Sequence, residues 1–408
     1  MAIKADLRHV IYALSDALDL VGVDDVGHGK RVGIMAHECG RKWGLTGADL
    51  TFLFDLGMLH DIGVSSTQMH RHLVSEFDWK GSGPHCELGH TLLRGFAPLA
   101  PLSVPVRYHH TPWEQLVTED IDAQAAWQSN LIFLVDRVDT LATAHHGIGT
   151  DMRYAHEIRR EILKRSGSTF APELVDLFLE TSRSEAFWLM LEPRSIHSFI
   201  QDRLSQSSRF VASMADLRKL ARIFSRIVDA KSPFTAEHSM GVAAIAQLLA
   251  RKLGLDESSQ AKIEIAGLLH DIGKLRVPDG ILDKPGRLDP QERQVINSHS
   301  FETYQILRNI KGFEEITPWA AYHHEEPGGS GYPFRLDANT LPIEARILRV
   351  ADIFQAMVQN RPYRKGQDRV QALGVLQDLA RQGRMEADLV ALMASCGDSA
   401  MVAAHGGI

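Results

Sequence analysis

Leu269-His270-Asp271-Ile272-Gly273 follows an apolar, helix-like stretch, and the same pentapeptide occurs earlier in the chain as Leu59-His60-Asp61-Ile62-Gly63. The residues upstream of the two pentapeptides also match. His28 lies 32 positions before His60, and His238 lies 32 positions before His270.

Further histidines and aspartates recur downstream with the same order. His85 lies 24 positions before the pair His109-His110, and His299 lies 24 positions before His323-His324. Asp136 then follows in the first set and Asp352 in the second. Because so many matches in one order are improbable by chance, we interpret the chain as two copies of one domain.

Composition excludes several classes of protein. The chain has 408 residues, 20 histidines and a formal net charge of −7. Its 3 cysteines lie far apart and exclude a disulfide scaffold or a cysteine zinc cluster. It lacks a membrane-length apolar run and a secretory start, which predicts a cytoplasmic protein without a membrane partner. The negative charge argues against binding of a nucleic acid polymer.

Helical periodicity predicts an all-α chain of two tandem domains joined by a long helix. Apolar residues of 242–253 recur at helical steps, and Gly254 follows where a C-terminal cap belongs. We expect a first domain over 1–195, a connecting helix over 196–229 and a second domain over 230–400. The connecting helix is read either as a core helix or as one that transmits signals or forms a homodimer.

The second copy carries a set of metal-ligand side chains: His238, His270, Asp271, His299, His323, His324 and Asp352. Imidazole and carboxylate donors suit Fe, Mn, Zn or Ni. Seven donors exceed the needs of one ion, so two ions are expected, with Asp271 bridging them. Two metals about 3.5–4 Å apart hold a hydroxide for attack on a phosphoester. One histidine alone is more often structural, and only the repeated set favours metal binding.

These segments resemble the HD superfamily of metal-dependent phosphohydrolases, and the second copy resembles its HD-GYP subfamily. The matching stretches are 270–274, 281–288, 323–333, 350–352 and 361–364. The resemblance implies tandem HD-type domains, of which the second is a phosphodiesterase for cyclic di-GMP. The spacing of the metal-ligand residues by itself predicts only the hydrolysis of a phosphoester by two metal ions.

The resemblance also implies roles for single residues. The seven donors of the second copy match the metal ligands of the family, and Asp271 and Lys274 are the expected catalytic residues. The expected substrate-binding residues are Lys274, Arg361, Arg364, Gly331, Tyr332 and Pro333. An ammonium or guanidinium group suits a phosphate, and a glycine-rich turn allows close backbone approach. The loop residues are alternatively read as an ordinary turn or as a surface for a signalling protein partner.

Two departures from the family pattern affect the expected product. Phe234 stands where some members carry a glutamate for a third metal, so we expect two ions and linear pGpG as the product, with GMP as the alternative. Gly328 stands where many members have aspartate, which loosens the loop without touching the metals.

The first copy keeps a comparable donor set: His28, His60, Asp61, His85, His109, His110 and Asp136. Val64 occupies the place of Lys274, and Thr111-Pro112-Trp113 replaces the Gly-Tyr-Pro loop. We therefore expect a divergent, regulatory domain with a second metal site. The alternatives are a packing remnant and an independent hydrolase.

Two alternatives to cyclic di-GMP hydrolysis stay open. The substrate is another cyclic dinucleotide, such as cyclic GMP-AMP, or the protein is a receptor that binds the dinucleotide without turnover. Iron and manganese are the first candidates for the metal, with zinc and nickel as alternatives.

Overall fold

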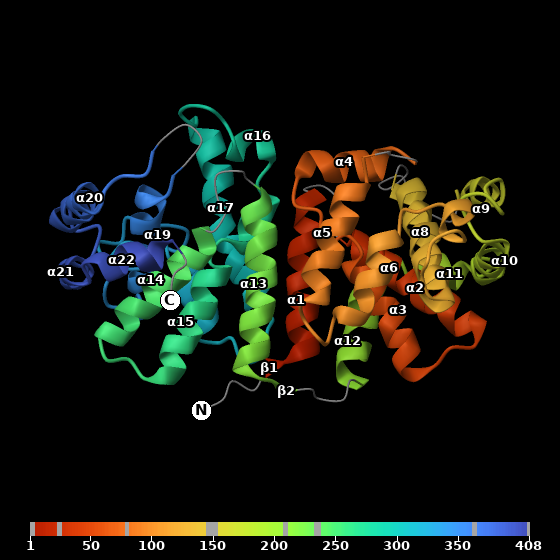
Figure 1. The fold of residues 1–408 in the computed structure, drawn as a ribbon, viewed down its shortest axis with the longest axis horizontal. Helices are drawn as coiled ribbons and strands as arrows, with labels where there is room; N and C mark the ends of the chain where they lie inside the picture. The colour runs from red at the N-terminus through yellow and green to blue at the C-terminus, as the bar shows by residue number, and fades with distance from the viewer. Residues whose placement is uncertain are drawn as a thin grey trace. The chain divides into compact units, whose positions relative to one another are not determined.

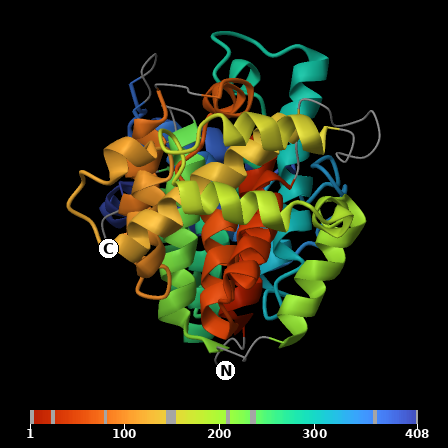
Figure 2. The same ribbon diagram turned by 90° about the vertical axis from the view of Figure 1, so that its right-hand side faces the viewer.

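The computed structural model describes residues 5–22, 27–77, 81–143, 154–206, 211–231, 238–360 and 365–405. Most of these residues are helical, as Figures 1 and 2 show. The chain forms two compact units, of which the first is Leu18–Ser208 and the second combines Met1–Ala17 with Arg209–Ile408. The predicted all-α class is confirmed.

The first unit is built of helices that surround the first histidine set. They are η1 (Leu20–Gly22), α2 (His28–Trp43), α3 (Gly47–Leu59), α4 (Thr67–Ser75), α5 (Gly83–Arg94), η2 (Ala100–Leu102), α6 (Ser103–Tyr108), α7 (Trp113–Leu116), α8 (Ala123–Thr143), α9 (Ala155–Leu163), α10 (Pro172–Thr181), α11 (Glu185–Leu189) and α12 (Pro193–Gln206).

The second unit combines one short strand pair with helices that surround the second histidine set. Its elements are β1 (Ala5–Asp6), most of α1 (Leu7–Asp19), β2 (Val211–Ala212), α13 (Met214–Lys231), α14 (His238–Lys252), α15 (Glu257–Leu269), η4 (Ile272–Arg276), α16 (Asp279–Leu282), α17 (Pro290–Leu307), α18 (Ile316–Ala321), α19 (Ile343–Val358), α20 (Arg369–Arg381), α21 (Ala387–Ser395) and α22 (Asp398–Ala404).

The same helix packing occurs in both units. In the first, α2 packs against α3 and α8, and α5 packs against α6. In the second, α14 packs against α15 and α19, and α17 packs against α18. Each histidine set lies at the ends or along the inner faces of these five helices, so the repeated spacing in the sequence becomes a repeated site in space.

Local sequence sets the ends of several of these helices. Gly254, predicted as a cap, has a φ of +77° and ends α14 in the left-handed conformation that glycine adopts without strain. Asp289 caps α17, where its side chain accepts the Glu292 amide and the Glu292 side chain accepts the Asp289 amide. This cap fixes the start of the helix that carries His299.

The expected connecting helix over 196–229 is wrong as a single element. Two helices, α12 and α13, occupy the segment, and strand β2 lies between them. Val211 and Ala212 pair antiparallel with Asp6 and Ala5. This backbone pairing interrupts the helix, and the buried stripe begins only at Leu217 in α13. Apolar residues at helical steps from Phe210 to Ile227 predict this helix, and Phe210 lies outside the described residues.

The strand pair also changes the expected domain limits. Met1–Ala17 belongs to the second unit, although the sequence predicted it in a first domain over 1–195. The segment that follows residue 195 stays in the first unit as far as Ser208.

Among the described residues, no single helix has both the length and the hydropathy of a membrane span, and only the bent pair α21 and α22 meets that test jointly.

A glycine in each pentapeptide allows the close approach that builds each site. A Cβ atom at Gly273 would lie 2.0 Å from the His299 carbonyl oxygen, and one at Gly63 would lie 2.0 Å from that of His85. In the second unit, the Thr303 hydroxyl also accepts the Gly273 amide at 3.1 Å. The turn after α15 is therefore pressed against α17, which brings Asp271 next to His299.

We expect Gly273→Ala to lower the free energy of unfolding by about 3 kcal/mol or more, because the new methyl group meets backbone that cannot move aside. Thermal unfolding should show a fall in Tm of roughly 5–10 °C. Gly374→Ala in α20 is the matched control, since nothing would lie within 4 Å of a Cβ atom at that position. That change should leave Tm equal or raise it. Equal melting of both variants would contradict the close approach.

Candidate metal centres

All seven predicted donors of the second copy lie within one cluster of five helices. They are His238 at the start of α14, His270 and Asp271 directly after α15, His299 in α17, His323 and His324 just beyond Tyr322 at the end of α18, and Asp352 in α19. His324 and Asp352 are half-buried, and the other five are buried.

Asp271 lies between two groups of imidazoles. Its Oδ2 atom is 3.3 Å from His270 Nε2 and 3.6 Å from His238 Nε2. Its Oδ1 atom is 3.4 Å from His299 Nε2 and 3.8 Å from His323 Nε2. The two oxygens thus face different donor groups, which is the geometry that a bridging carboxylate requires.

Each donor group is completed by one further residue. Asp352 Oδ1 is 3.3 Å from His238 Nε2 and 4.0 Å from His270 Nε2. The His324 ring centroid is 4.0 Å from that of His323 and 5.1 Å from that of His299. The cluster therefore has two half-sites, His238 with His270 and Asp352, and His299 with His323 and His324.

Backbone carbonyl groups orient the imidazoles. The Nδ1 atoms of His270, His299 and His323 each lie 2.6–2.7 Å from the carbonyl oxygen three residues earlier. A carbonyl oxygen only accepts, so Nδ1 carries the proton and the Nε2 lone pair points toward Asp271. Such outer contacts fix the ring and tautomer of histidines that bind metal.

Electrostatics keep three of these donors in the forms that bind a cation, whereas for His270 the charges of Asp271 and Asp352 outweigh burial and raise the pKa. Burial opposes ionisation of Asp271, but His270 and Lys274 hold the pKa of its carboxyl well below the usual value. Burial lowers the pKa of His299 to about 4 and that of His323 well below the usual value. At neutral pH the carboxylate is charged and these two imidazoles are neutral.

The donor set fits two divalent ions. His270 Nε2 and Asp271 Oδ1 are buried side-chain atoms without a hydrogen-bond partner. Buried polar atoms are normally satisfied, and a cation satisfies lone pairs that face one another. Nitrogen and oxygen donors of this kind suit Fe, Mn, Zn or Ni.

Lys274 contacts the cluster from η4. Its Nζ atom is 2.5 Å from Asp271 Oδ2, and the side chain is only 19 % exposed. The lysine therefore faces the half-site of His238 and His270.

The predicted Gly-Tyr-Pro loop lies beside the other half-site. The Tyr332 amide donates to the His324 carbonyl oxygen at 3.3 Å, and the two rings are 4.8 Å apart between centroids. A Cβ atom at Gly331 would lie 2.4 Å from Glu325 Cα, so only glycine allows this approach. Pro333 follows Tyr332 in the same loop.

Sequence reasoning missed the residues that hold this loop. The fully buried Glu325 accepts the backbone amides of Phe334 at 2.6 Å and Leu336 at 3.0 Å. Its neighbour Glu326 pairs with Arg349 at 2.7 Å and with Arg384 at 2.8 Å. The only signal was an acidic pair directly after His324, which by itself resembles a solvated surface.

Gln355 was missed as well. Its Oε1 atom is 2.5 Å from His238 Nδ1, and the side chain is buried in α19. Because Oε1 only accepts, it fixes the His238 tautomer as the carbonyl groups do for the other rings. Gln355 follows Asp352 by three residues, as Asp139 follows Asp136, so the repeat contained the signal.

Three residues named from the sequence lie outside the described residues. They are Arg361 and Arg364, expected to contact substrate, and Phe234, at the position of a third-metal ligand.

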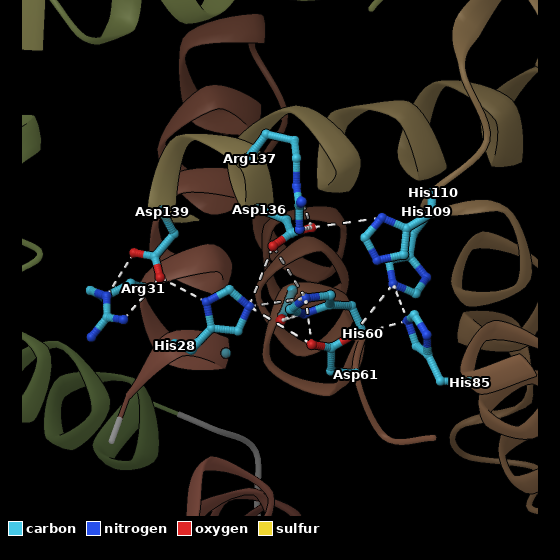
Figure 3. Close-up of polar contacts among 12 residues, drawn as sticks. His28, Arg31, His60, Asp61, His85, His109, His110, Asp136, Arg137 and Asp139 are labelled. Carbon is cyan, nitrogen blue, oxygen red and sulfur yellow. Dashed lines mark hydrogen bonds and ion pairs between the residues drawn. The ribbon is translucent and has the colours of Figure 1, made fainter. Parts of the chain in front are cut away.

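The first copy brings its own predicted donors together. Figure 3 shows Asp61 between His60 on one side and His85 and His109 on the other. His110 completes the latter group, and its Nδ1 atom is 4.0 Å from Asp136 Oδ2. His28 and Asp136 complete the group of His60 (Figure 3). Burial lowers the pKa of His60 to about 4.

The sequence of this chain is similar to one known family and to several characterised proteins. Residues 222–389 match the family described as "HD domain". A "3'3'-cGAMP-specific phosphodiesterase 1" of Vibrio cholerae is 34 % identical over 95 % of this chain and 90 % of its own length. The cyclic di-GMP phosphodiesterase response regulator RpfG of Xanthomonas campestris is 35 % identical over 45 % of this chain and 50 % of its own length.

A solved structure extends the likeness to the fold. The crystal structure of a cyclic GMP-AMP-specific phosphodiesterase of V. cholerae aligns with a TM-score of 0.64, over 97 % of this chain and 98 % of the other. Its sequence identity is 23 %, so this likeness concerns the fold.

Proposed function

Because the chain belongs to the HD-domain phosphodiesterases of the HD-GYP type, we propose that its second copy hydrolyses a cyclic dinucleotide and that 3'3'-cGAMP is the main substrate. The observation that carries this substrate is the 34 % identity to the cGAMP-specific relative along 95 % of the chain. The resemblance to the HD-GYP subfamily implies cyclic di-GMP, with cyclic GMP-AMP as the alternative.

The site chemistry supports hydrolysis of a phosphodiester. Two divalent ions held by the seven donors would activate a water molecule and stabilise negative charge on the phosphate oxygens. In the proposed reaction, water oxygen bonds to phosphorus and the bond from phosphorus to a ribose 3' oxygen breaks. That oxygen takes a proton, and the product is a linear dinucleotide with a 5' phosphate.

The residues of the chain take separate parts in this proposal. Asp271 holds the two half-sites in register through its two oxygens. Lys274 presents an ammonium group at the edge of the cluster, where it neutralises phosphate charge or protonates the leaving oxygen. Tyr332 borders the cluster beside His324 and limits the space open to the substrate. Gly331 allows that loop to approach Glu325 closely, and Glu325 holds it through the Phe334 and Leu336 amides.

Cyclic di-GMP is the second candidate substrate. Relatives with that activity in their names match shorter parts of the chain, as the Xanthomonas regulator does over 45 %. A Pseudomonas aeruginosa relative, also a cyclic di-GMP phosphodiesterase, is 36 % identical over 34 % of the chain. With this substrate the linear product is pGpG.

The substrate proposal is tested by comparing the hydrolysis of 3'3'-cGAMP with that of cyclic di-GMP. The anaerobically purified protein is loaded with Mn²⁺ or Fe²⁺ and incubated with each dinucleotide, and products are separated by chromatography. We expect kcat/KM for 3'3'-cGAMP to exceed that for cyclic di-GMP by about 10-fold or more. The reverse order would establish the second candidate. If the protein binds its full complement of metal but forms no product from either dinucleotide, the proposal of hydrolysis is wrong and the protein is a receptor.

Gln355→Leu should weaken metal binding in the second copy by about 10- to 100-fold, because His238 loses the partner that fixes its ring. Metal titration of the stripped protein measures this affinity. Gln305→Leu in α17 is the control, because the Gln305 side chain accepts from Arg308 at 3.3 Å rather than from a histidine of the cluster. Equal affinity in both variants would show that Gln355 does not support His238.

A further inference from the structure

The donors of the first copy reproduce the spacing of the second, although the surrounding sequence differs. His28 Nε2 is 3.4 Å from Asp136 Oδ1, against 3.3 Å for the matching pair of the second copy. His85 Nε2 is 3.2 Å from Asp61 Oδ1, against 3.4 Å. His85 and His109 are 3.3 Å apart between Nε2 atoms, as are their counterparts.

The first cluster also leaves a buried polar atom without a partner. Asp61 Oδ1 has no hydrogen-bond partner, although it faces His85 Nε2 at 3.2 Å. A cluster retained only for packing would be expected to satisfy such atoms with neighbouring side chains. Imidazole and carboxylate lone pairs that face one another instead indicate a binding site for a cation.

We infer that the first copy is a second resident metal centre, which holds its own pair of divalent transition-metal ions without hydrolysing the substrate. His28, His60 and Asp136 form one half of this centre, and His85, His109 and His110 form the other. Asp61 joins the halves through its two oxygens. The ions stabilise the first unit, and turnover belongs to the second copy.

The outer contacts of the first centre favour firm retention of metal. Asp139 Oδ2 is 2.7 Å from His28 Nδ1, where the second copy has the neutral Gln355. Arg31 holds this carboxylate with contacts of 2.6 Å and 2.9 Å (Figure 3). A carboxylate behind the imidazole raises its basicity as a ligand.

The first copy differs from the second at three places where the second copy has groups that we expect to act on a substrate. Val64, which is buried, stands where Lys274 contacts its bridging aspartate. Arg137 occupies Asp136 Oδ2 at 2.8 Å. The segment after His110 turns away, because the Trp113 amide donates to the Thr169 carbonyl oxygen, whereas the Tyr332 amide of the second copy donates to His324.

Metal counting tests this inference on the full chain. Wild type, Asp61→Asn, Asp271→Asn and the double variant are purified anaerobically with Mn²⁺ and analysed by native mass spectrometry and elemental analysis. We expect four ions in the wild type, two in each single variant and none in the double variant. Under mild chelation, Asp271→Asn should keep its two ions longer than Asp61→Asn, because the first centre has the carboxylate support of Asp139.

Thermal unfolding supplies a readout apart from hydrolysis. The ions bind the folded protein, so chelation should lower the Tm of Asp271→Asn by several degrees through loss of the first-copy ions. His85→Gln is the second variant if Asp61→Asn fails to fold, with circular dichroism as the folding control. It should also lose ions from the first copy.

Two results would overturn the inference. A wild-type chain with two ions, both retained in Asp61→Asn and lost in Asp271→Asn, would show that the first copy holds none. Hydrolysis of 3'3'-cGAMP by Asp271→Asn with two ions bound would show that the first copy is a hydrolase. Failure of the proposed substrate is a separate result, because the ion count does not depend on turnover.

Discussion

Asp271→Asn should abolish hydrolysis, with kcat reduced by about 10³-fold or more, because the shared carboxylate of both half-sites is lost. The amide keeps the shape of the side chain but removes its charge and one acceptor oxygen. Product formation from 3'3'-cGAMP measures the effect, and elemental analysis should show loss of the second-copy ions.

Asp378→Asn serves as the control for this change. Asp378 is 58 % exposed on α20 and pairs only with Arg381 among the contacts described for it. Loss of the Asp378 charge should leave turnover within about 2-fold of wild type, since an exposed ion pair contributes little to stability. If Asp271→Asn stays active, the catalytic site has been misplaced, and the first copy becomes the candidate.

Lys274→Met should reduce kcat by about 10²- to 10³-fold while the metal content stays at the wild-type level. Methionine keeps much of the length of the side chain and removes the ammonium group that lies 2.5 Å from Asp271 Oδ2. A charge that acts on the transition state affects kcat more than KM, so initial rates over a range of substrate concentrations separate the two effects.

Lys164→Met is the matched control for the lysine, because Lys164 pairs with Glu161 on the surface at 2.6 Å. It should retain wild-type kcat. Loss of metal from Lys274→Met would assign this residue a structural part in the cluster rather than a part in catalysis.

The prediction of a single connecting helix was wrong, and the reason shows what a local sequence pattern cannot predict. The apolar stripe from Met214 to Ile227 has helical spacing, and α13 forms there as expected. Val211 and Ala212 instead pair with Asp6 and Ala5, far away in the sequence. Periodicity reports only neighbours along one helix, so it cannot reveal a strand partner at the other end of the chain.

The support around the second site was hidden for a different reason. Glu325 and Gln355 are buried, yet polar residues of these types usually lie at the surface. Each is stable inside the fold only because particular groups face it, the amides of Phe334 and Leu336 for one and His238 for the other. Those partners meet only after the helices pack.

Helical periodicity in the sequence predicted the all-α class, and residue types that recur in one order predicted the duplication and the members of both donor sets. The tertiary structure decided which oxygen of Asp271 faces which half-site, which groups fix the imidazoles and where Met1–Ala17 belongs. Spacing along the chain places a residue on a helix, whereas direction and contact depend on how separate helices pack against one another.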